Sequence, residues 1–492
     1  MMSDPHSIHI AIIGGGIAGT AIAREFSKYE LQVALFEKEP DLATGTTKAN
    51  SAILHAGFDA ATDSLKATLN VRGNQLFHEL EEDLHLDIDW TGSLVAATTE
   101  DEMETLKELL ERGQANGVPG LEILSQEQVM GKEPNLSPNV IGALWAPTGG
   151  VCWPFGAAIA FAQCAEQNGA KIYTNCPVTQ IEKNENGTFR LTTPQGIFNA
   201  NYLINAAGIH AGEISQLAGD DSFTITPRKG EYLFFDKAMK KDLVQGVVFP
   251  APSKISKGIL VCTTTHGNTF VGPNAQNITD IEDTSTSPEG INEIISSARK
   301  LIPTLPLHAT ITQFSGLRAV SSTNDFVIGA SPKVTGLYHA AGIQSPGLTA
   351  APAIAEKLVA LIDKVEPLPR KDNFIPTLPK KKVFHKLSQR EQAQAIKDNP
   401  LYGRVICRCE IVTEAEIVEA IHEPCGARTL DGIKRRTRAG MGRCQGGFCG
   451  PRITDILARE LKIPVTQVRK EEHNSILFFE KNSVLSQEDR HE

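Results

Sequence analysis

The stretch IHIAIIGGGIAGTAIAREFSKYELQVALFEKE, residues 8–39, decides the fold of the N-terminal part of the chain. It opens with an isoleucine-rich run of the kind that forms a buried parallel strand. Gly14, Gly16 and Gly19 then give the pattern G-x-G-x-x-G, which predicts a tight turn into a helix whose N-terminal amides bind a pyrophosphate. A second strand ends at Glu37, where a carboxylate can accept hydrogen bonds from ribose hydroxyls. The stretch therefore predicts a Rossmann-like dinucleotide site, for either FAD or NAD.

Two further segments repeat the order strand, glycine, helix. They are YLINAAGIHAGEIS at 202–215 and GLYHAAGIQSPGLTAAPAIAEKLVALI at 336–362, and a loop of small and polar residues at 43–57 can run beside a flavin. Because such units stand near both ends of residues 8–362, they predict one sheet built around a large cofactor, with a second domain inserted between them. The candidate cofactor-binding residues in these segments are Ser51, Ala207, Gly208, Gly342, Gly347 and Leu348.

Length and charge narrow the class of protein. A chain of 492 residues predicts two or three domains, and a formal net charge of −10 argues against nucleic acid as a partner. The N-terminus lacks a basic segment followed by an apolar core, so we expect no secretory signal. No apolar stretch approaches the ~20 residues of a membrane span, so we expect no transmembrane segment. The expected location is the cytoplasm, with peripheral contact at the inner face of the membrane as a second option.

Five of the nine cysteines fall within residues 407–449. Cys407 and Cys409 form one close pair and Cys444 and Cys449 another, in loops between short predicted helices. Because a chain without an export signal keeps its cysteines reduced, four thiols on converging loops predict a metal site. Zinc and an iron–sulfur cluster both accept four thiolates, although Cys-x-Cys is unusual for structural zinc. Unpaired structural thiols are the third option.

Seven short motifs, taken in order, resemble one family of flavoenzymes. They are IGGGIAG, NSAILHAGF, NAAGIHA, KGEYLFF, VGPNA, GLRAVSSTNDFVIG and AAGIQSPGLTAAPAIA. Through them residues 8–362 resemble the FAD-dependent oxidoreductases of the D-amino-acid-oxidase superfamily, in particular the glycerol-3-phosphate dehydrogenase and L-2-hydroxyglutarate dehydrogenase branches. The resemblance implies an α/β fold over residues 1–365, in which a Rossmann-like FAD-binding domain carries an inserted antiparallel β substrate domain. The implied FAD-binding segments are about 8–60, 150–220 and 325–362, and the substrate-domain segments are about 85–145 and 223–325.

The cysteine-rich segment resembles the bacterioferritin-associated-ferredoxin-like (BFD-like) [2Fe–2S] domain, in the variant that is appended to flavin dehydrogenases. The resemblance implies a small helical domain at 401–460 whose four paired cysteines bind the cluster, with zinc as the second candidate. A proline- and lysine-rich linker at 366–400 would precede this domain, and a C-terminal tail at 461–492 would follow it. The arginines expected to offset the negative charge of the cluster are Arg408, Arg435, Arg436, Arg438 and Arg443.

The family resemblance also implies catalytic roles for three side chains. Arg318, in GLR, matches the arginine that binds the anionic group of the substrate, and a guanidinium fork suits a carboxylate or a phosphate. His55, in LHAG, is expected near the flavin, where it orients the substrate or accepts a proton. His266, in TTTHGN, is a second candidate base. The competing roles are structural: an ion pair for Arg318 and packed rings for the histidines.

Together these features predict a FAD-dependent dehydrogenase that oxidises a small anionic secondary alcohol, sn-glycerol 3-phosphate to dihydroxyacetone phosphate. Electrons would leave through the [2Fe–2S] cluster to an acceptor protein or a quinone, with partner subunits as a further option. The appended cysteine domain is typical of the anaerobic glycerol-3-phosphate type. Asp59 stands where glycerol-3-phosphate relatives carry an arginine, and its carboxylate would repel a phosphate. His55-Ala56-Gly57 also resembles the hydroxyglutarate branch, so L-2-hydroxyglutarate is the second candidate substrate. A non-catalytic electron-transfer subunit and an amine-oxidising enzyme are two further candidate functions.

Overall fold

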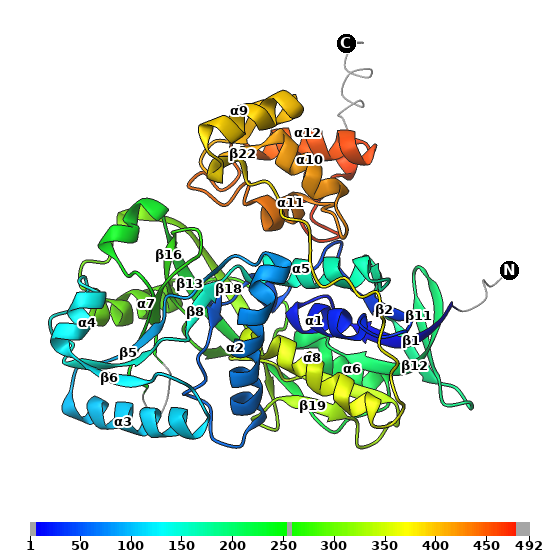
Figure 1. Ribbon diagram of the computed structural model, residues 1–492, viewed down its shortest axis with the longest axis horizontal. Helices are drawn as coiled ribbons and strands as arrows, with labels where there is room; N and C mark the ends of the chain where they lie inside the picture. The colour runs from blue at the N-terminus through cyan, green and yellow to red at the C-terminus, as the bar shows by residue number, and fades with distance from the viewer. Residues whose placement is uncertain (1–5, 253–257, 479–492) are drawn as a thin grey trace, which may run out of the picture. The chain divides into compact units, whose positions relative to one another are not determined.

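The computed structural model describes residues 6–252 and 258–478, and its contacts divide the chain into two units (Figure 1). The first unit comprises residues 1–38 and 42–380, and the second comprises residues 39–41 and 381–492. None of the helices within the described ranges combines the length and the apolar character that a membrane crossing requires.

The first unit contains an eight-stranded sheet of order β10-β11-β12-β1-β2-β9, with β20 beside β12 and β19 beside β20. Its parallel strands are β1 (His6–Ile13), β2 (Val33–Phe36), β9 (Lys171–Tyr173), β12 (Gly196–Asn205) and β20 (Leu337–Ala341). Its antiparallel strands are β10 (Gln180–Lys183), β11 (Phe189–Thr193) and β19 (Val327–Ala330). The helices α1 (Ile17–Phe26), α2 (Leu65–Leu84), α5 (Pro154–Gln167), α6 (Ala211–Leu217) and α8 (Gly347–Asp363) pack around it. This part of the unit is the predicted Rossmann-like α/β fold.

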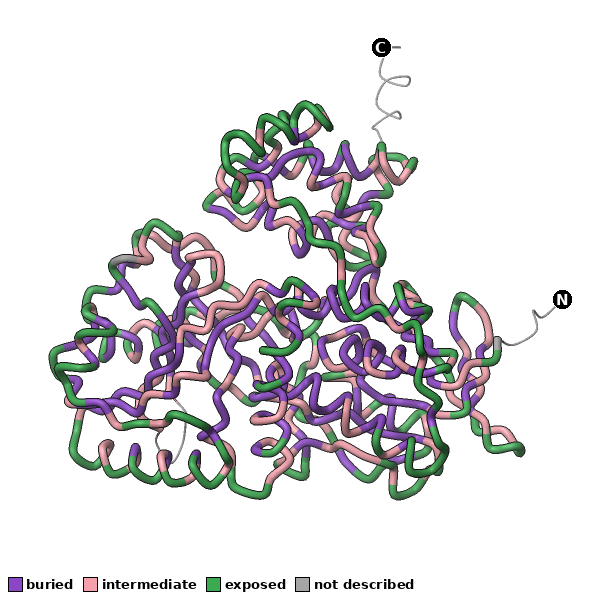
Figure 2. Tube along the Cα trace, viewed as in Figure 1, coloured by how far each residue is buried: buried purple, intermediate pink, exposed green. Residues whose placement is uncertain are grey.

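A second, nine-stranded sheet carries the inserted part of the first unit. Its strands are β17 (Gln276–Asn277), β13 (Ile225–Phe235), β16 (Thr269–Gly272), β15 (Leu260–Thr263), β14 (Val247–Pro250), β5 (Ser93–Ala97), β7 (Gly142–Ala146) and β6 (Glu122–Ser125), in that order, with β18 (Thr310–Ser321) beside β13. All neighbours are antiparallel except β14 and β5. The helices α3 (Glu100–Ala115), α4 (Gln126–Lys132) and α7 (Pro288–Leu301) cover its buried residues (Figure 2). The expected antiparallel domain is confirmed.

A small three-stranded sheet completes the first unit. It consists of β3 (Ile53–Leu54), β8 (Gly150–Cys152) and β4 (Ile88–Asp89). The 3-10 turn η1 (Thr46–Lys48) precedes β3, and the 3-10 turn η2 (Gly208–His210) follows β12.

The stretch 366–400, expected as a linker, contributes to both units. Its first part lies along the first unit, where Ile375 exchanges two hydrogen bonds of 2.8 Å with the side chain of Asn168. Its second part forms α9 (Gln389–Asp398) in the second unit, and this helix begins with a capping box between Ser388 and Glu391. Only part of the stretch is therefore irregular.

The second unit is small and mainly helical, as predicted. Its elements after α9 are β21 (Val405–Cys407), β22 (Val412–Thr413), α10 (Glu414–His422), α11 (Leu430–Thr437) and α12 (Gly450–Leu461). Thr413 and Glu416 form the capping box of α10. The core is built on aliphatic side chains of the three last helices, among them Ile417, Ile433 and Leu457, and also includes Cys407 and Cys449.

Candidate functional site

The turn between β1 and α1 is built for close approach of backbone segments. Gly14 has φ +115°, and a Cβ there would stand 2.4 Å from the carbonyl oxygen of Ala206. A Cβ on Gly19 would stand 1.9 Å from the carbonyl oxygen of Gly14. At Gly16 the nearest atom would be Thr47 Oγ1, at 3.3 Å. Backbone packing therefore requires the first and third glycines, whereas a Cβ on the second would crowd only the side-chain hydroxyl of Thr47, at the N-terminus of α1 where a phosphate is predicted to bind.

Two side chains hold this turn in place. Glu37 is buried, and its Oε2 accepts a hydrogen bond of 2.7 Å from the amide of Gly15. Thr47 Oγ1 accepts one of 3.0 Å from the amide of Ile17, in the first turn of α1. Ribose binding by Glu37 stays a prediction. Thr47 was not predicted, because the small polar loop at 43–57 does not indicate which of its hydroxyls reaches the helix.

The predicted cofactor residues lie where parallel strands end. β2, β1, β12 and β20 are adjacent and parallel, so their carboxyl ends meet at one edge of the sheet, where α/β proteins bind cofactors. The residues that follow these ends are Gly14, Glu37, Ala207, Gly208 and Gly342, and Gly347 and Leu348 begin α8. Nothing lies within 4 Å of a Cβ placed on Gly208. The structure brings this set together, and its contacts with FAD stay predictions.

His55 is fixed to the start of α8. Its backbone amide donates to Thr349 Oγ1 at 2.9 Å, and its ring Nε2 lies 3.2 Å from Ser345 Oγ. The ring of Phe249 lies 6.0 Å away, centroid to centroid. The structure therefore places the imidazole at the start of α8, within the predicted FAD-binding segment 325–362, with one ring nitrogen in contact with a hydroxyl.

Arg318, on β18, lies over β13. Both terminal nitrogens of its guanidinium are 3.3 Å from the carbonyl oxygen of Asn274, and a Cβ on Gly230 would stand 2.7 Å from Nη2. Burial raises the pKa of Tyr232, although hydrogen bonds from Ser51 and Arg318 to its hydroxyl oppose this effect. Ser51 Oγ is 3.3 Å from that hydroxyl. Gly230 and Tyr232, both in the motif KGEYLFF, thus lie next to the guanidinium of Arg318.

A second arginine stands beside the first. Arg228 on β13 is the direct cross-strand partner of Arg318, and its Nε donates to Asn277 Oδ1 at 2.8 Å. Neither guanidinium pairs with a carboxylate in the part of the chain that the structure describes. Like charges opposite one another in a sheet repel, so the pair forms an anion-attracting surface. Sequence reasoning missed Arg228, because only the register of β13 and β18 reveals its position.

His266 belongs to a different group of residues. It lies in the turn between β15 and β16, where Nδ1 is 2.8 Å from Thr265 Oγ1 and Nε2 is 3.8 Å from Asp87 Oδ2. Its ring meets Trp153 edge to face, with 5.1 Å between centroids. These contacts account for the histidine structurally, and the proposed role as a base gains no support from them.

The four paired cysteines converge in the second unit. Cys407 Sγ and Cys409 Sγ are 3.8 Å apart. Further thiol contacts join Cys407 to Cys449 and Cys409 to Cys444. Cys407 and Cys449 are buried, whereas Cys409 and Cys444 are partly exposed. Four sulfurs from two loops therefore meet at one place near the surface of the unit.

Contacts in these loops favour the thiolate at two of the four cysteines, Cys407 and Cys444, whereas burial raises the pKa of Cys409 and the contact with Cys407 raises that of Cys449. The contact with Cys449 lowers the pKa of Cys407 to about 5, and the amides of Gly440 and Glu410 act in the same direction against burial. The amide of Phe448 lowers the pKa of Cys444. Thiolates bind iron, so this donor set fits a cluster. Within residues 6–252 and 258–478 no three His, Cys, Asp or Glu side chains are placed to hold a single metal ion, so the fit to a cluster rests on the chemistry of the four neighbouring thiols.

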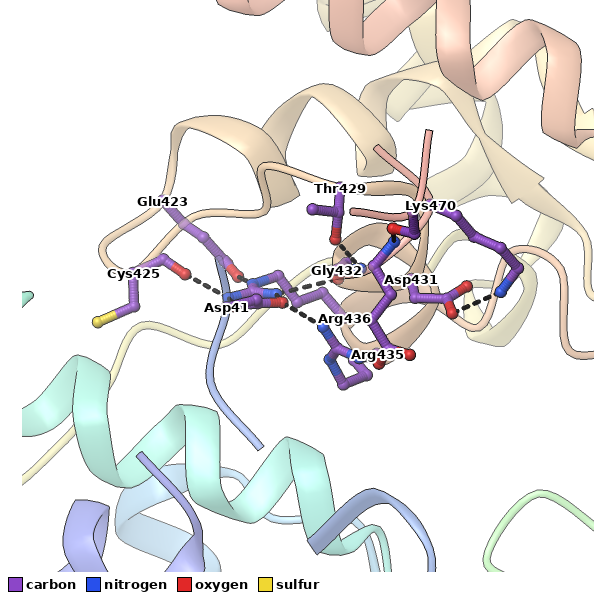
Figure 3. Close-up of polar contacts among 11 residues, drawn as sticks. Asp41, Glu423, Cys425, Thr429, Asp431, Gly432, Arg435, Arg436 and Lys470 are labelled. Carbon is purple, nitrogen blue, oxygen red and sulfur yellow. Dashed lines mark hydrogen bonds and ion pairs between the residues drawn. The ribbon is translucent and has the colours of Figure 1, made fainter. Parts of the chain in front are cut away.

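Three of the arginines expected to offset the charge of the cluster are paired with carboxylates. Arg436 Nη1 and Nη2 donate to Asp41 at 2.8 Å each, and Arg435 Nη2 donates at 2.9 Å (Figure 3). None of these three side chains is more than 3 % exposed. Arg438 Nε pairs with the buried Glu410 at 3.0 Å. The expectation for these arginines is corrected: their charges are neutralised within the protein.

Comparisons with known families agree with both parts of the structure. The family described as FAD dependent oxidoreductase matches residues 9–361, and the BFD-like [2Fe-2S] binding domain matches residues 405–459. Both matches agree with the resemblances seen in the motifs.

Individual relatives differ in how much of the chain they share. A protein of Caloramator mitchellensis called glycerol 3-phosphate dehydrogenase is 45% identical over 472 residues, 95% of this chain and 97% of its own length. The mitochondrial L-2-hydroxyglutarate dehydrogenase of Caenorhabditis elegans is 33% identical over 276 residues, 54% of this chain and 63% of its own length. The solved structure of dithionite-reduced L-alpha-glycerophosphate oxidase from Mycoplasma pneumoniae with FAD bound has a TM-score of 0.71 at 31% identity, covering 76% of this chain and 100% of the oxidase.

Proposed function

The chain belongs to the FAD dependent oxidoreductase family, and on that basis we propose that it oxidises sn-glycerol 3-phosphate to dihydroxyacetone phosphate. Its cofactors are FAD and a [2Fe–2S] cluster. The observation that carries the proposal is the arginine pair Arg318 and Arg228, which has no carboxylate partner among the described residues. The glycerol 3-phosphate dehydrogenase of Caloramator mitchellensis supports the choice of substrate, because its similarity extends over 95% of this chain.

The side chains divide the work as follows. Arg318 and Arg228 bind the phosphate, since guanidinium groups match phosphate oxygens in pairs. His55 accepts the proton of the substrate hydroxyl, and Ser345, whose Oγ lies 3.2 Å from Nε2, orients its ring. When bound, FAD supplies the two-electron acceptor for the hydride of the substrate carbon, and the [2Fe–2S] cluster supplies a one-electron route outward.

The first prediction concerns the substrate. Under anaerobic conditions we expect sn-glycerol 3-phosphate to bleach the visible flavin absorbance of the purified protein, and L-2-hydroxyglutarate to leave it unchanged. Bleaching by the diacid alone would reject the phosphate ester in favour of the second candidate. If neither compound bleaches the flavin, a non-catalytic electron carrier is the better description of the protein.

A second prediction tests the orientation of His55. Ser345→Ala removes the hydroxyl that lies 3.2 Å from Nε2. A hydrogen bond of this kind contributes about 0.5–1.5 kcal/mol, so we expect the rate of flavin reduction to fall roughly 2- to 10-fold with the FAD content unchanged. Ser296→Ala, at an exposed position on α7, is the matched control and should have no effect. An unchanged rate in Ser345→Ala would show that the hydroxyl does not orient the base.

A further inference from the structure

The loop that carries two of the cluster ligands exposes a large aromatic side chain. Phe448 is 83% exposed, although it stands directly before the buried Cys449. Its backbone amide hydrogen-bonds the sulfur of Cys444, so the loop is held by its main chain while the phenyl ring is in solvent. Removing such a ring from water is favourable, and no described residue of the second unit covers it.

The segments around the paired cysteines, including the first turn of α12, carry an excess of positive charge. Arg408 stands between Cys407 and Cys409, and Arg452 stands three residues after Cys449. Both side chains are exposed, and neither pairs with a carboxylate in the described part of the chain.

No free carboxylate opposes this charge within the loops. The only acidic residue in segments 405–411 and 440–452 is Glu410, which is buried against Arg438. The two segments that carry the four cysteines are therefore net positive, in a chain whose net charge is −10.

We propose that Phe448, Arg408 and Arg452 form the docking face for an acidic one-electron carrier protein. An apolar centre within a charged rim is the usual anatomy of a protein interface, and electron-transfer contacts are small, about 1,200 Å² or less. Charge complementarity selects the sign of the partner and steers its approach. Cys444, the partly exposed ligand whose sulfur touches the Phe448 amide, lies at this face.

The electron count fits such a carrier. Oxidation of one secondary alcohol to a ketone releases two electrons and two protons. Two oxidised carrier molecules therefore dock in turn, each accepts one electron from the cluster, and the two protons pass to solvent. This proposal rests on the proposed function only for the origin of the electrons.

The test uses the full-length protein with both cofactors. Protein reduced by dithionite and freed of the reagent is mixed in a stopped-flow instrument with a small acidic [2Fe–2S] ferredoxin. At low salt we expect electron transfer to slow about tenfold in Phe448→Ala and about tenfold in the double variant Arg408→Gln/Arg452→Gln, whose rate should also lose its salt dependence. The matched controls are Phe478→Ala, another exposed aromatic of the second unit, and Arg390→Gln/Lys397→Gln on α9.

Several results would overturn the proposal. They are equal rates in the docking variants and the controls, equally fast reduction of a basic cytochrome c, and concentration-dependent dimerisation that buries Phe448. Reduction of a quinone only in the presence of anionic lipid vesicles would assign the face to a membrane instead. Because dithionite supplies the electrons, a failure of glycerol 3-phosphate to bleach the flavin leaves this experiment intact.

Discussion

Replacement of Arg318 by methionine is expected to lower kcat/KM for sn-glycerol 3-phosphate by a factor of roughly 30 to 5,000. The physical reason is that the phosphate of the bound substrate loses the guanidinium of Arg318 as its charged partner in a half-buried site. Leaving one charge of such a pair unpaired costs about 2–5 kcal/mol. Methionine keeps much of the apolar stem of Arg318 and loses the guanidinium, whose Nη2 is the part that approaches Gly230. Steady-state rates with a small-molecule electron acceptor, together with FAD content, provide the measurement.

Two control variants separate charge from geometry at this position. Arg318→Lys keeps the charge but lacks the planar fork, and we expect it to recover only part of the loss. Arg190→Met removes an arginine of β11 that already has a carboxylate partner, Glu182 at 3.0 Å, and should leave kcat/KM unchanged. If Arg318→Met retained full activity at low substrate concentration, the guanidinium would be structural and the anion site would lie elsewhere.

Replacement of Asp41 by asparagine is expected to destabilise the second unit by about 3–5 kcal/mol. Asp41 receives three hydrogen bonds from Arg435 and Arg436, and its removal leaves two buried guanidinium groups without this charge partner. Breaking a buried ion pair by removing one member costs this much because the remaining charge is desolvated. Denaturant unfolding followed by the visible absorbance of the cluster measures the loss. Asp398→Asn, at the end of α9, is the exposed control.

The same carboxylate predicts how stability depends on pH. Burial alone would raise the pKa of Asp41, but the charges and hydrogen bonds of Arg436 and Arg435 outweigh it and lower the pKa from 3.8 to about 2. A group with a lowered pKa in the folded state stabilises the protein above its unfolded pKa and loses that contribution as the pH falls. The difference in unfolding free energy between wild type and Asp41→Asn should therefore be constant above pH 4 and shrink from about pH 4 to about pH 2. A pH-independent difference would contradict the ion-pair explanation.

The parts of the site that sequence could predict are local in the chain. Gly14, Gly16, Gly19 and Glu37 fall within one strand–helix–strand unit, so their spacing alone implies the turn, and the structure explains two of the glycines by backbone contacts. The convergence of Cys407, Cys409, Cys444 and Cys449 is likewise predictable from their close pairing, and their role as cluster ligands stays a prediction. Such features can be predicted from the sequence because the residues that form them are close to one another in the chain.

The remaining parts depend on contacts between distant residues. Ser51 meets Tyr232 across 181 positions, and His55 meets Ser345 across 290. Only strand register places Arg228 opposite Arg318, and no local pattern distinguishes it from an exposed arginine. The local pattern gave a wrong prediction for Arg435 and Arg436. Because they lie near the cysteines in sequence, they were expected to offset the charge of the cluster, whereas they pair with Asp41.

Residues 39–41 belong to the second unit although they lie near the start of the chain. A fragment that starts at residue 381 is consequently an incomplete iron–sulfur domain and cannot simply be fused to another protein. Such a fragment would lack Asp41, and it would have to fold around Arg436 with its main counter-ion absent. A chimaera that exchanges the second unit between proteins must therefore also exchange residues 39–41, from the N-terminal part of the chain.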